Sequence, residues 1–360
     1  MPNPELSIII PTFNEADALP LLLGDLARQQ GVLFEVIVAD GCSVDATCQL
    51  ANELFDSGRL SGTCHIGPSG RGRQLNAGVS LAHSEWLLFL HADSRLGQAN
   101  QLHVALDFLR NRQQQDVSDS SAGRFALSFG ALAEQNFGLF FYETKARLGR
   151  PGCIHGDQGM LMTKSFFYRV GPFREDLPVM EDTSLAEGIR TFGQWLLLPG
   201  QIVTSDRRFQ VEGIKSRQTL NALMMNFLSI GWLEFFNRAP NLYRQQDSAQ
   251  PLQLSPFLFL IEDLFAEMPL RARWAIWLAT GKYVRSQAWQ IGLAMDCRKA
   301  FREGAEPQPH SGRWLKRFDR WFDPLTNHYF GSLFTALLVR LWFAWQLFGK
   351  QRNRMLTRTK

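Results

Sequence analysis

The sequence is poor in cysteine, and its cysteines show no pattern. The five residues are Cys42, Cys48, Cys64, Cys153 and Cys297. Their number is odd and no two of them have C-x-x-C spacing, which argues against a disulfide framework and against a structural zinc site. The same scarcity is typical of proteins that fold in a reducing compartment.

Two nucleotide-binding fingerprints are also missing. The first apolar run, residues 6–10, is followed by PTFNE and not by G-x-G-x-x-G, which disfavours a nicotinamide-dependent enzyme. No G-x-x-x-x-G-K-[ST] pattern occurs in the chain, which excludes a P-loop ATPase. The N-terminus has no basic segment before its short apolar run, so we do not expect a signal peptide there.

The C-terminal sixty residues contain little negative charge. From residue 301 onward, eleven Lys and Arg residues are opposed by only four acidic ones, whereas the net charge of the whole 360-residue chain is +4. Such a tail suits an anionic partner, and a solvated basic tail fits the pattern equally well. We expect an anionic membrane surface and no nucleic acid. The longest apolar stretch, residues 330–349, contains Arg340 and Gln346 and is marginal as a membrane span.

The composition is that of an ordinary globular protein, with 45% apolar and 20% charged residues. Between residues 6 and 112, the apolar runs LSIII, FEVIVA, TCHIG and EWLLFL alternate with helical patterns. Strands that are apolar along their whole length predict a parallel sheet covered on both faces, and hence an α/β fold. The polar segment QQQDVSDSS, residues 113–121, is expected to be a surface loop.

The predicted domain boundary lies at QQDSAQP, residues 245–251. It separates an α/β domain, residues 1–244, from a helical, Trp-rich and basic extension, residues 252–360. The tryptophans of the extension fit either a helical core or an amphipathic helix at a membrane interface, and the last segment, LFTALLVRLWFAWQLFGKQRNR, fits the second best.

Four polar clusters stand where ligands bind in α/β sheets, at the carboxyl ends of strands or before a helix. They are PTFNE at residues 11–15, DGCSVD at 40–45, GRGRQLNAG at 70–78 and HADS at 91–94. The first two suit a base and a ribose, the third a phosphate, and the fourth a divalent cation with oxygen ligands. Alternatively, Asp40 and Ser43 cap the following helix, and GRGR is a basic turn.

The order of six motifs resembles glycosyltransferase family 2 with the GT-A fold. They are IIIPTFNE, VIVADGCSVDAT, GRGRQLNAG, LLFLHADS, GDQG and MEDTSL. The sequence is similar, more narrowly, to a bacterial branch with LHAD in place of the usual D-x-D. The resemblance covers about residues 5–240 and leaves the last 110 residues unexplained. It implies a GT-A sheet that binds a nucleotide-diphosphate sugar.

The resemblance also implies roles for individual residues at the donor site. Asp40 stands where the family pairs with the base, and Asp93 where it binds Mg²⁺ or Mn²⁺. The other positions implied to contact the donor are Pro11, Thr12, Glu15, Arg71, Arg73, Asn76, Gly78, His91 and Ala92, with Arg207 or Arg208 at the diphosphate. The sequence departs from the family at Gly41, where an aspartate is usual, and at Phe209, where a tryptophan is common.

The remaining implied residues belong to the chemical step. Asp182 matches the catalytic base, and Asp157 of GDQG stands at the acceptor or donor sugar. Glu181 belongs to the same sugar site or is an ordinary charge at a helix N-terminus. A hydroxyl is a weak nucleophile, so a carboxylate must remove its proton, and direct attack on the anomeric carbon inverts its configuration.

These residues predict an inverting, metal-dependent glycosyltransferase with a hydroxyl or phosphate acceptor, including lipid-linked ones. We expect it in the cytoplasm, peripheral at the inner face of the cytoplasmic membrane. A nucleotide-sugar-binding protein without activity is the alternative, because His91 and Gly41 replace two usual acids. A nucleotidyltransferase would need a G-x-G signature near the N-terminus, which PTFNE does not supply.

Overall fold

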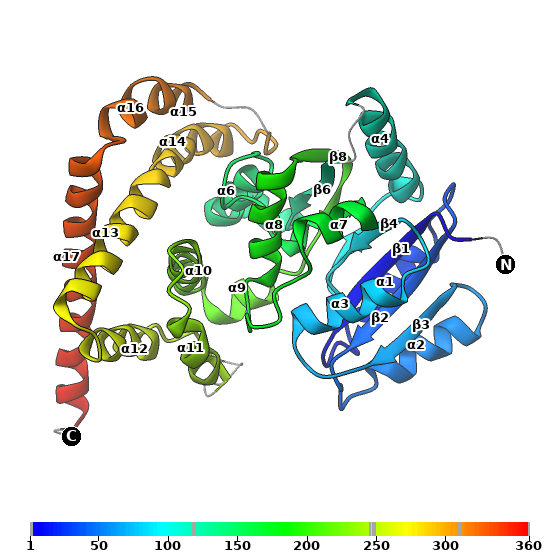
Figure 1. Cartoon of the computed structure of the whole chain (residues 1–360), viewed down its shortest axis with the longest axis horizontal. Coiled ribbons are helices and arrows are strands. Elements are labelled where there is room, and N and C mark those ends of the chain that lie inside the picture. The colour runs from blue at the N-terminus through cyan, green and yellow to red at the C-terminus, as the bar shows by residue number, and fades with distance from the viewer. Residues whose placement is uncertain (1–2, 117–119, 245, 247–249, 309–311, 359–360) are drawn as a thin grey trace. The chain divides into compact units, whose positions relative to one another are not determined.

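The computed structural model describes residues 3–116, 120–244, 246, 250–308 and 312–358. The chain divides into two compact units, which Figure 1 colours from blue to green and from green to red. The first unit comprises residues 1–205 and 307–309, and the second comprises residues 206–306 and 310–360. The units are described separately below.

The first unit is built on one mixed sheet with the strand order β3-β2-β1-β4-β7-β6-β8-β5. β1 to β4 are parallel to one another, whereas β7 runs antiparallel to both of its neighbours. This is a mixed α/β sheet, and the predicted α/β fold class is confirmed. The strands are β1 (Leu6–Thr12), β2 (Phe34–Asp40), β3 (Gly62–Ile66), β4 (Trp86–Phe89), β5 (Arg95–Leu96), β6 (Ser121–Ser128), β7 (Met160–Thr163) and β8 (Gln194–Val203).

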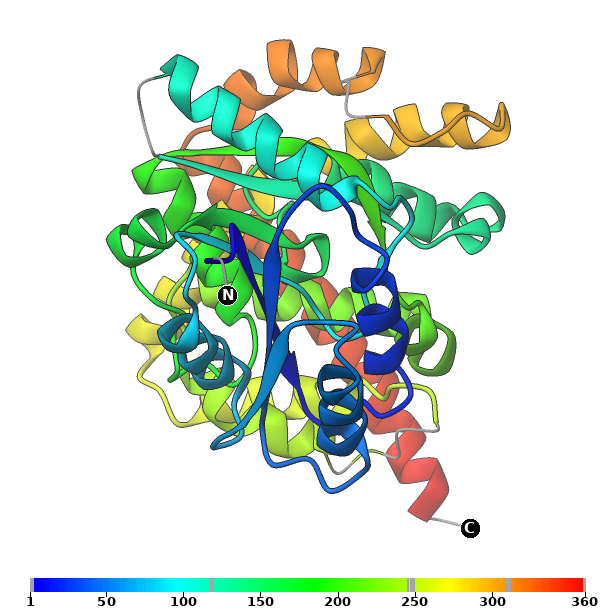
Figure 2. The same ribbon diagram turned by 90° about the vertical axis from the view of Figure 1, so that its right-hand side faces the viewer.

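Helices cover both faces of the parallel strands (Figure 2). Ile8 and Ile10 of β1 pack into a buried cluster with leucines of α1, whereas Ile9 points to the other face and meets α3 at Gly78. This alternation is why β1 is apolar at every position. The helices of the first unit are α1 (Leu19–Leu26), α2 (Thr47–Asp56), α3 (Arg71–Leu81), α4 (Gln101–Asp116), α5 (Ala131–Gln135), α6 (Phe137–Ala146), η1 (Gly156–Gln158), α7 (Lys164–Val170) and α8 (Glu181–Phe192).

The loop predicted for residues 113–121 is wrong at both of its ends. Residues 113–116 continue α4, and β6 begins at Ser121. Gln and Arg form helices well, so the polar residues at the end of α4 continue the helix although they lack apolar side chains. Residues 117–119 lie outside the described part of the chain.

All the regular secondary-structure elements in the described residues of the second unit are helices, as predicted for the C-terminal extension. Its compact body begins at Asp206, whereas the sequence predicted a boundary at residues 245–251, of which 245 and 247–249 lie outside the described residues. The predicted domain limits therefore stay a prediction. The helices are α9 (Arg207–Glu212), α10 (Ile214–Ser229), α11 (Glu234–Arg244), α12 (Ser255–Ala266), α13 (Leu270–Ser286), α14 (Trp289–Arg302), α15 (Arg313–Arg317), η2 (Phe318–Phe322), α16 (Asp323–Thr326) and α17 (Tyr329–Arg358).

The tryptophans of the second unit divide between core and surface. Trp277 stacks on Phe265 and meets Phe343 of α17 edge-on, and Trp289 is buried. The exposed ones are Trp274, Trp314, Trp321, Trp342 and Trp345. The reading as a helical core therefore holds for Trp277 and Trp289, and the membrane-interface reading of the exposed tryptophans stays a prediction.

The long helix α17 packs along α13, and the two run side by side in Figure 1. A Cβ at Gly281 of α13 would lie 2.3 Å from the carbonyl oxygen of Ser332 and 2.6 Å from the Ala336 Cβ. The glycine therefore permits the close approach of the two helices. By length and composition, residues 329–348 of α17 form the one stretch of the described chain that could cross a membrane.

Candidate active site

The sheet topology brings the HADS and GDQG motifs together. β4 and β7 are antiparallel neighbours, and Phe89 at the end of β4 pairs with Met160 at the start of β7. Residues that follow Phe89 therefore lie beside residues that precede Met160. A Cβ built on Gly156 would lie 2.6 Å from His91 Nε2, which shows how closely the two segments meet.

Asp182, near the N-terminus of α8, lies against the same glycine. Its Oδ2 accepts a hydrogen bond from the Gly156 backbone N–H at 2.8 Å, and its Oδ1 accepts one from the Thr183 N–H at 2.7 Å. Burial alone would raise the pKa of this carboxyl, but Arg71, His155 and His91 outweigh it and lower the pKa to about 2. Asp182 is therefore a fixed carboxylate at neutral pH.

Asp157 of η1 has the opposite electrostatic character. Burial raises the pKa of this carboxyl to about 7, and the neighbouring charges of Asp182 and Asp93 act in the same direction. Its Oδ1 atom is buried and has no hydrogen-bond partner among the described residues. Two carboxyls with pKa values far apart thus interact with each other, an arrangement typical of acid–base sites.

Arg71 and Glu181 form an ion pair across this cluster. Arg71 is the first residue of α3, and its Nε donates to the Glu181 Oε1 atom. Glu181 is completely buried, and burial raises the pKa of its carboxyl while Arg71 opposes that shift. The charges of Glu181, Asp182 and Asp157 together raise the pKa of the Arg71 guanidinium. Glu181 is not an ordinary exposed charge at a helix N-terminus, and its predicted contact with a sugar stays a prediction.

Three residues of this site were not found by sequence reasoning. His155 bonds the Thr183 hydroxyl through Nδ1 at 2.9 Å, and burial lowers the pKa of its imidazole to about 4. Gln158 accepts a hydrogen bond from Arg124 of β6 at 3.0 Å and donates one to the Cys153 carbonyl at 2.8 Å. The position of His155 directly before GDQG was a usable signal, whereas nothing in the sequence pointed to Arg124.

The loops after β1 and β2 are joined through Asp40. Its carboxylate accepts hydrogen bonds from the Thr12 hydroxyl at 2.8 Å and from the Ser43 N–H at 2.7 Å. Burial would raise the pKa of Asp40, and the bonds from Ser43 and Thr12 lower it below its ordinary value. The Cys48 side chain of α2 also bonds Asp40. The backbone N–H of Thr47, at the start of that helix, donates to Asp45 and not to Asp40.

Further hydrogen bonds tie the same two loops together. Asn14 donates its backbone N–H to the Ser43 hydroxyl and accepts from the Val44 N–H, at 2.8 and 2.9 Å. The Glu15 N–H donates to the Thr47 hydroxyl at 2.8 Å. The PTFNE and DGCSVD motifs therefore form one continuous surface, as expected for residues that bind the same ligand.

In α3, two predicted donor-binding residues have a clear packing role. The amide of Asn76 donates to the Phe173 carbonyl and accepts from the Phe173 N–H, which holds the following loop. Gly78 leaves room for β1, because a Cβ there would lie 2.4 Å from Ile9 Cγ2. Arg73 lies 3.7 Å from Glu175, and both side chains are half-exposed. Contacts of these residues with a donor stay predictions.

The remaining predicted residues fall into two groups. Pro11 and Ala92 are buried at the strand ends that border the site. Arg207 and Arg208 begin α9 in the second unit, so their contact with a diphosphate also stays a prediction.

The acidic cluster suits a divalent cation in its chemistry. Asp93, Asp157, Glu181 and Asp182 supply carboxylate oxygens, the ligands that Mg²⁺ and Mn²⁺ prefer, and Arg71 lies among them as a counter-charge. No group of three or more His, Cys, Asp or Glu side chains is arranged to hold a metal ion among the described residues. A cation here would therefore need further oxygens from a ligand such as a diphosphate.

Parts of the chain are similar to known proteins. Residues 7–173 match the family described as Glycosyl transferase family 2. A "PGL/p-HBAD biosynthesis glycosyltransferase" of Mycobacterium bovis (strain BCG / Pasteur 1173P2) is 37% identical over 118 residues, 32% of this chain and 46% of that protein. The "Succinoglycan biosynthesis protein ExoO" of Rhizobium meliloti (strain 1021) is 31% identical over 208 residues, 57% of each chain.

Among solved structures, a mannosyltransferase from Pyrobaculum calidifontis in complex with GDP-Man and Mn²⁺ gives a TM-score of 0.49 at 17% identity, covering 94% of this chain and 88% of that one. The chain spans about half the length of the curated relatives it matches. The family match includes the loops around Asp40, the HADS motif and the GDQG motif. Residues 7–173, slightly less than half of this chain, are thus similar to glycosyltransferase family 2.

Proposed function

We propose that the protein is an inverting glycosyltransferase that moves a sugar from a nucleotide-diphosphate sugar to a hydroxyl or phosphate acceptor. One observation carries the proposal. The carboxyls of Asp93, Asp157 and Asp182 come from separate segments of the chain, and the charges of Asp93, Asp182 and Arg71 all act on Asp157. In such a cluster a carboxylate can deprotonate an acceptor, and Arg71 together with a bound cation can balance the charge of a departing diphosphate.

Asp182 is the base in this proposal. Its two backbone hydrogen bonds fix the carboxylate, so that it can take the acceptor proton without first reorienting. Attack of the acceptor on the face of the anomeric carbon opposite the nucleotide inverts the configuration in a single displacement. Asp157 and His91 then border the position of the transferred sugar.

A divalent cation, Mg²⁺ or Mn²⁺, would be held by Asp93 together with the donor diphosphate. When bound, it would stabilise the negative charge that develops on the leaving nucleoside diphosphate. Arg71 supplies a further positive charge, although its ion pair with Glu181 already engages it. The joined loops after β1 and β2 would bind the base and ribose, with Asp40 at their centre.

The acceptor in this proposal includes lipid-linked substrates, and the protein acts in the cytoplasm at the inner face of the cytoplasmic membrane. The exposed apolar residues of α17 support this placement. An amphipathic surface of that kind would bring the site to acceptors held in the bilayer.

A donor panel tests the proposal. Purified protein is incubated with UDP-, GDP- and dTDP-sugars, with Mg²⁺, Mn²⁺ or EDTA, and release of the nucleoside diphosphate is followed. We expect one donor to be consumed in the presence of a metal and none in EDTA. A donor that binds tightly with metal but is never consumed, with or without candidate acceptors, would identify a nucleotide-sugar-binding protein instead.

A further inference from the structure

The outer face of α17 is apolar over residues 329–348. Phe330, Phe334, Leu341, Trp345 and Phe348 are each more than 60% exposed and follow one another at helical spacing. No charged side chain interrupts this stripe, since Arg340 lies on another side of the helix and stacks on Trp274 at 5.3 Å. A helix that faces water would carry polar residues there. The stripe therefore lacks a partner within the unit.

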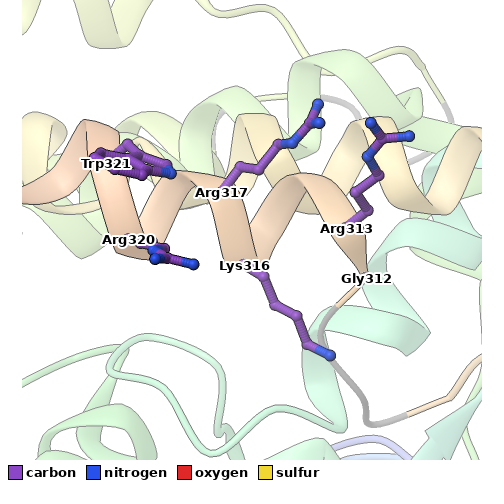
Figure 3. A pocket seen from close by; sticks show the side chains of 6 residues that line it. All are labelled: Gly312, Arg313, Lys316, Arg317, Arg320 and Trp321. Carbon is purple, nitrogen blue, oxygen red and sulfur yellow. The ribbon is translucent and has the colours of Figure 1, made fainter.

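A cationic cluster precedes this helix in the chain. Arg313, Lys316, Arg317 and Arg320 line an open pocket of about 600 Å³ together with Trp321 and Gly312. Figure 3 shows Lys316 and Arg320 projecting to one side of the helix and Arg313 and Arg317 to the other. Two of the guanidinium groups stack on tryptophans, Arg317 on Trp314 at 5.0 Å and Arg320 on Trp321 at 5.2 Å.

The fold holds this cluster in place. Leu315 is completely buried, and its backbone N–H donates to Asp296 of α14 at 2.8 Å. The Trp314 N–H donates to the other oxygen of the same carboxylate at 3.0 Å. Gly292 of α14 allows the approach, because a Cβ there would meet the Trp314 carbonyl at 3.0 Å. The cationic side chains are thus kept outside while Leu315 anchors the segment.

The cluster and the stripe are continuous along the chain. Trp321, Leu325 and Tyr329, which connect them through η2 and α16, are also more than 60% exposed. This order matches the chemistry of an anionic bilayer surface. The cations suit the head-group phosphates, the tryptophans suit the interface, and the apolar helix face suits the acyl chains below.

Two other occupants of this face fit less well. A second copy of the chain would place like charges near one another, since basic residues stand on both sides of the stripe and no acidic residue follows Asp323. A transmembrane course would place Arg340 near the middle of residues 329–348, where a charged side chain is costly. A helix that lies flat in the interface avoids both problems.

We propose that the second unit docks on anionic phospholipid membranes, with residues 313–320 contacting the head-group phosphates and the outer face of α17 inserted at the level of the acyl chains. The proposal deepens the location given under the proposed function. It does not depend on the catalytic site, because vesicle binding and donor turnover are measured separately.

Vesicle sedimentation tests the docking surface. Full-length protein is mixed with phosphatidylcholine vesicles that contain either no phosphatidylglycerol or about a third of it, at low and at 0.5 M salt. We expect strong binding to the anionic vesicles, weakened by salt. The variant K316E/R317E/R320E should bind them about 100-fold more weakly, since each cation near the surface contributes roughly a factor of five. The variant F334S/L341S should also lose binding.

The matched control reverses three exposed cations outside the surface, in the variant R59E/R112E/K299E. It changes the net charge by the same amount and should bind as the unaltered protein does. Equal loss in the control and in the cluster variant would show a mere effect of net charge and overturn the proposal. Equal binding to neutral and anionic vesicles would also overturn the proposal. A protein that sediments as a dimer and binds no vesicles would overturn it as well.

Extraction distinguishes docking from spanning. Protein bound to vesicles should be released at pH 11 in carbonate, whereas protein that stays with the membrane would overturn the interfacial placement. Donor turnover of the cluster variant in detergent-free buffer should equal that of the unaltered protein. If turnover is absent in both while vesicle binding behaves as expected, the proposed activity fails and the docking surface stands.

Discussion

Arg71 and Glu181 are separated by 110 residues in the sequence, yet they form an ion pair that joins the first residue of α3 to the first residue of α8. Glu181 is completely buried and has one further oxygen, Oε2, with no hydrogen-bond partner among the described residues. The pair thus ties the helix after the GRGR motif to the helix that carries Asp182. Its integrity determines where Asp182 stands.

Breaking this pair from one side should destabilise the first unit. Arg71→Met leaves a buried carboxylate without its counter-charge, and we expect a loss of about 3 kcal/mol in the free energy of unfolding. Arg71→Met combined with Glu181→Met should recover at least half of it, because no unpaired charge then remains. Urea unfolding of the unaltered protein, of the variants Arg71→Met and Glu181→Met, and of the double variant measures these free energies of unfolding.

Arg73→Met is the matched control, two residues along the same helix. Its ion pair with Glu175 is half-exposed, so we expect less than about 0.5 kcal/mol. A double variant that is as unstable as the sum of its two single variants would contradict the role given to the pair.

Asp182→Asn should remove transfer and spare donor binding. The amide oxygen can still accept a backbone hydrogen bond, but it cannot take a proton, so we expect kcat to fall about 10²- to 10⁴-fold. Donor affinity, measured by calorimetry, should change less than about threefold. Asp56→Asn, at an exposed site on α2, should leave both quantities unchanged. A large loss of donor affinity would show that Asp182 binds the donor and is not the base.

Gly156→Ala should disturb the site without disturbing the fold. The added methyl group would lie 2.6 Å from His91 Nε2 and 2.8 Å from Asp182 Oδ2, so both side chains must move. A displacement of this size in a reacting geometry costs on the order of 100-fold in kcat. Gly97→Ala is the control, since nothing lies within 4 Å of a Cβ there. Unchanged kcat in Gly156→Ala would exclude Asp182 and His91 from the chemical step.

Substitutions at two glycines test whether Gly78 serves the packing of the fold or the binding of the donor. Gly78→Ala places a methyl group 2.4 Å from Ile9 Cγ2, and overpacking of this kind should cost about 1–3 kcal/mol. Gly24→Ala, in α1 with open space around it, should stabilise the fold by about 0.5–1 kcal/mol. Thermal unfolding distinguishes the two. If Gly78→Ala unfolds normally but binds donor poorly, the predicted donor contact is right and the packing role is wrong.

Asp25 should govern part of the acid sensitivity. It is buried in α1 and accepts hydrogen bonds from Arg95 Nε at 2.6 Å and from the Leu96 N–H at 3.1 Å. Burial would raise the pKa of its carboxyl, but Arg95 and Leu96 lower it below the ordinary value of 3.8. The resulting stabilisation is therefore complete above about pH 4 and is lost as the pH falls through the lower, folded-state pKa.

Asp25→Asn should accordingly cost about 2 kcal/mol at pH 7 and flatten the acid limb of the stability curve. Unfolding in urea between pH 2.5 and 7 gives both measurements. Asp17→Asn, at an exposed position on the preceding loop, should follow the unaltered protein. A constant difference between Asp25→Asn and the unaltered protein at every pH would rule out the ionised form as the source of stability.

The sequence was sufficient for the sheet because its signal is local. β1, β2 and β4 are apolar at nearly every position, and polar motifs begin where these strands end. The apolar run GMLMT predicts β7 as a strand, but its antiparallel pairing with β4 could not be predicted from such a signal. The pairing of Phe89 with Met160 joins residues 71 positions apart.

Site residues that belong to a sequence motif were predicted. Residues whose role depends on a partner far away in the sequence were missed. Glu181 resembled a helix-terminal charge because its partner is encoded 110 residues earlier. Arg124 supports Gln158 from a strand that carries no polar motif of its own. Burial, which sets the pKa of Asp157 and His155, depends on the packing of the whole unit and cannot be read from neighbouring residues.

The hydrogen bonds between the loops after β1 and β2 have a consequence for affinity. Asn14, Ser43 and Thr47 already hold both loops in one conformation before any ligand arrives. The entropy of ordering them is lost during folding and not during association, so a ligand that fits this surface keeps more of its contact energy as binding energy. A preorganised wall of this kind favours rapid capture over induced fit.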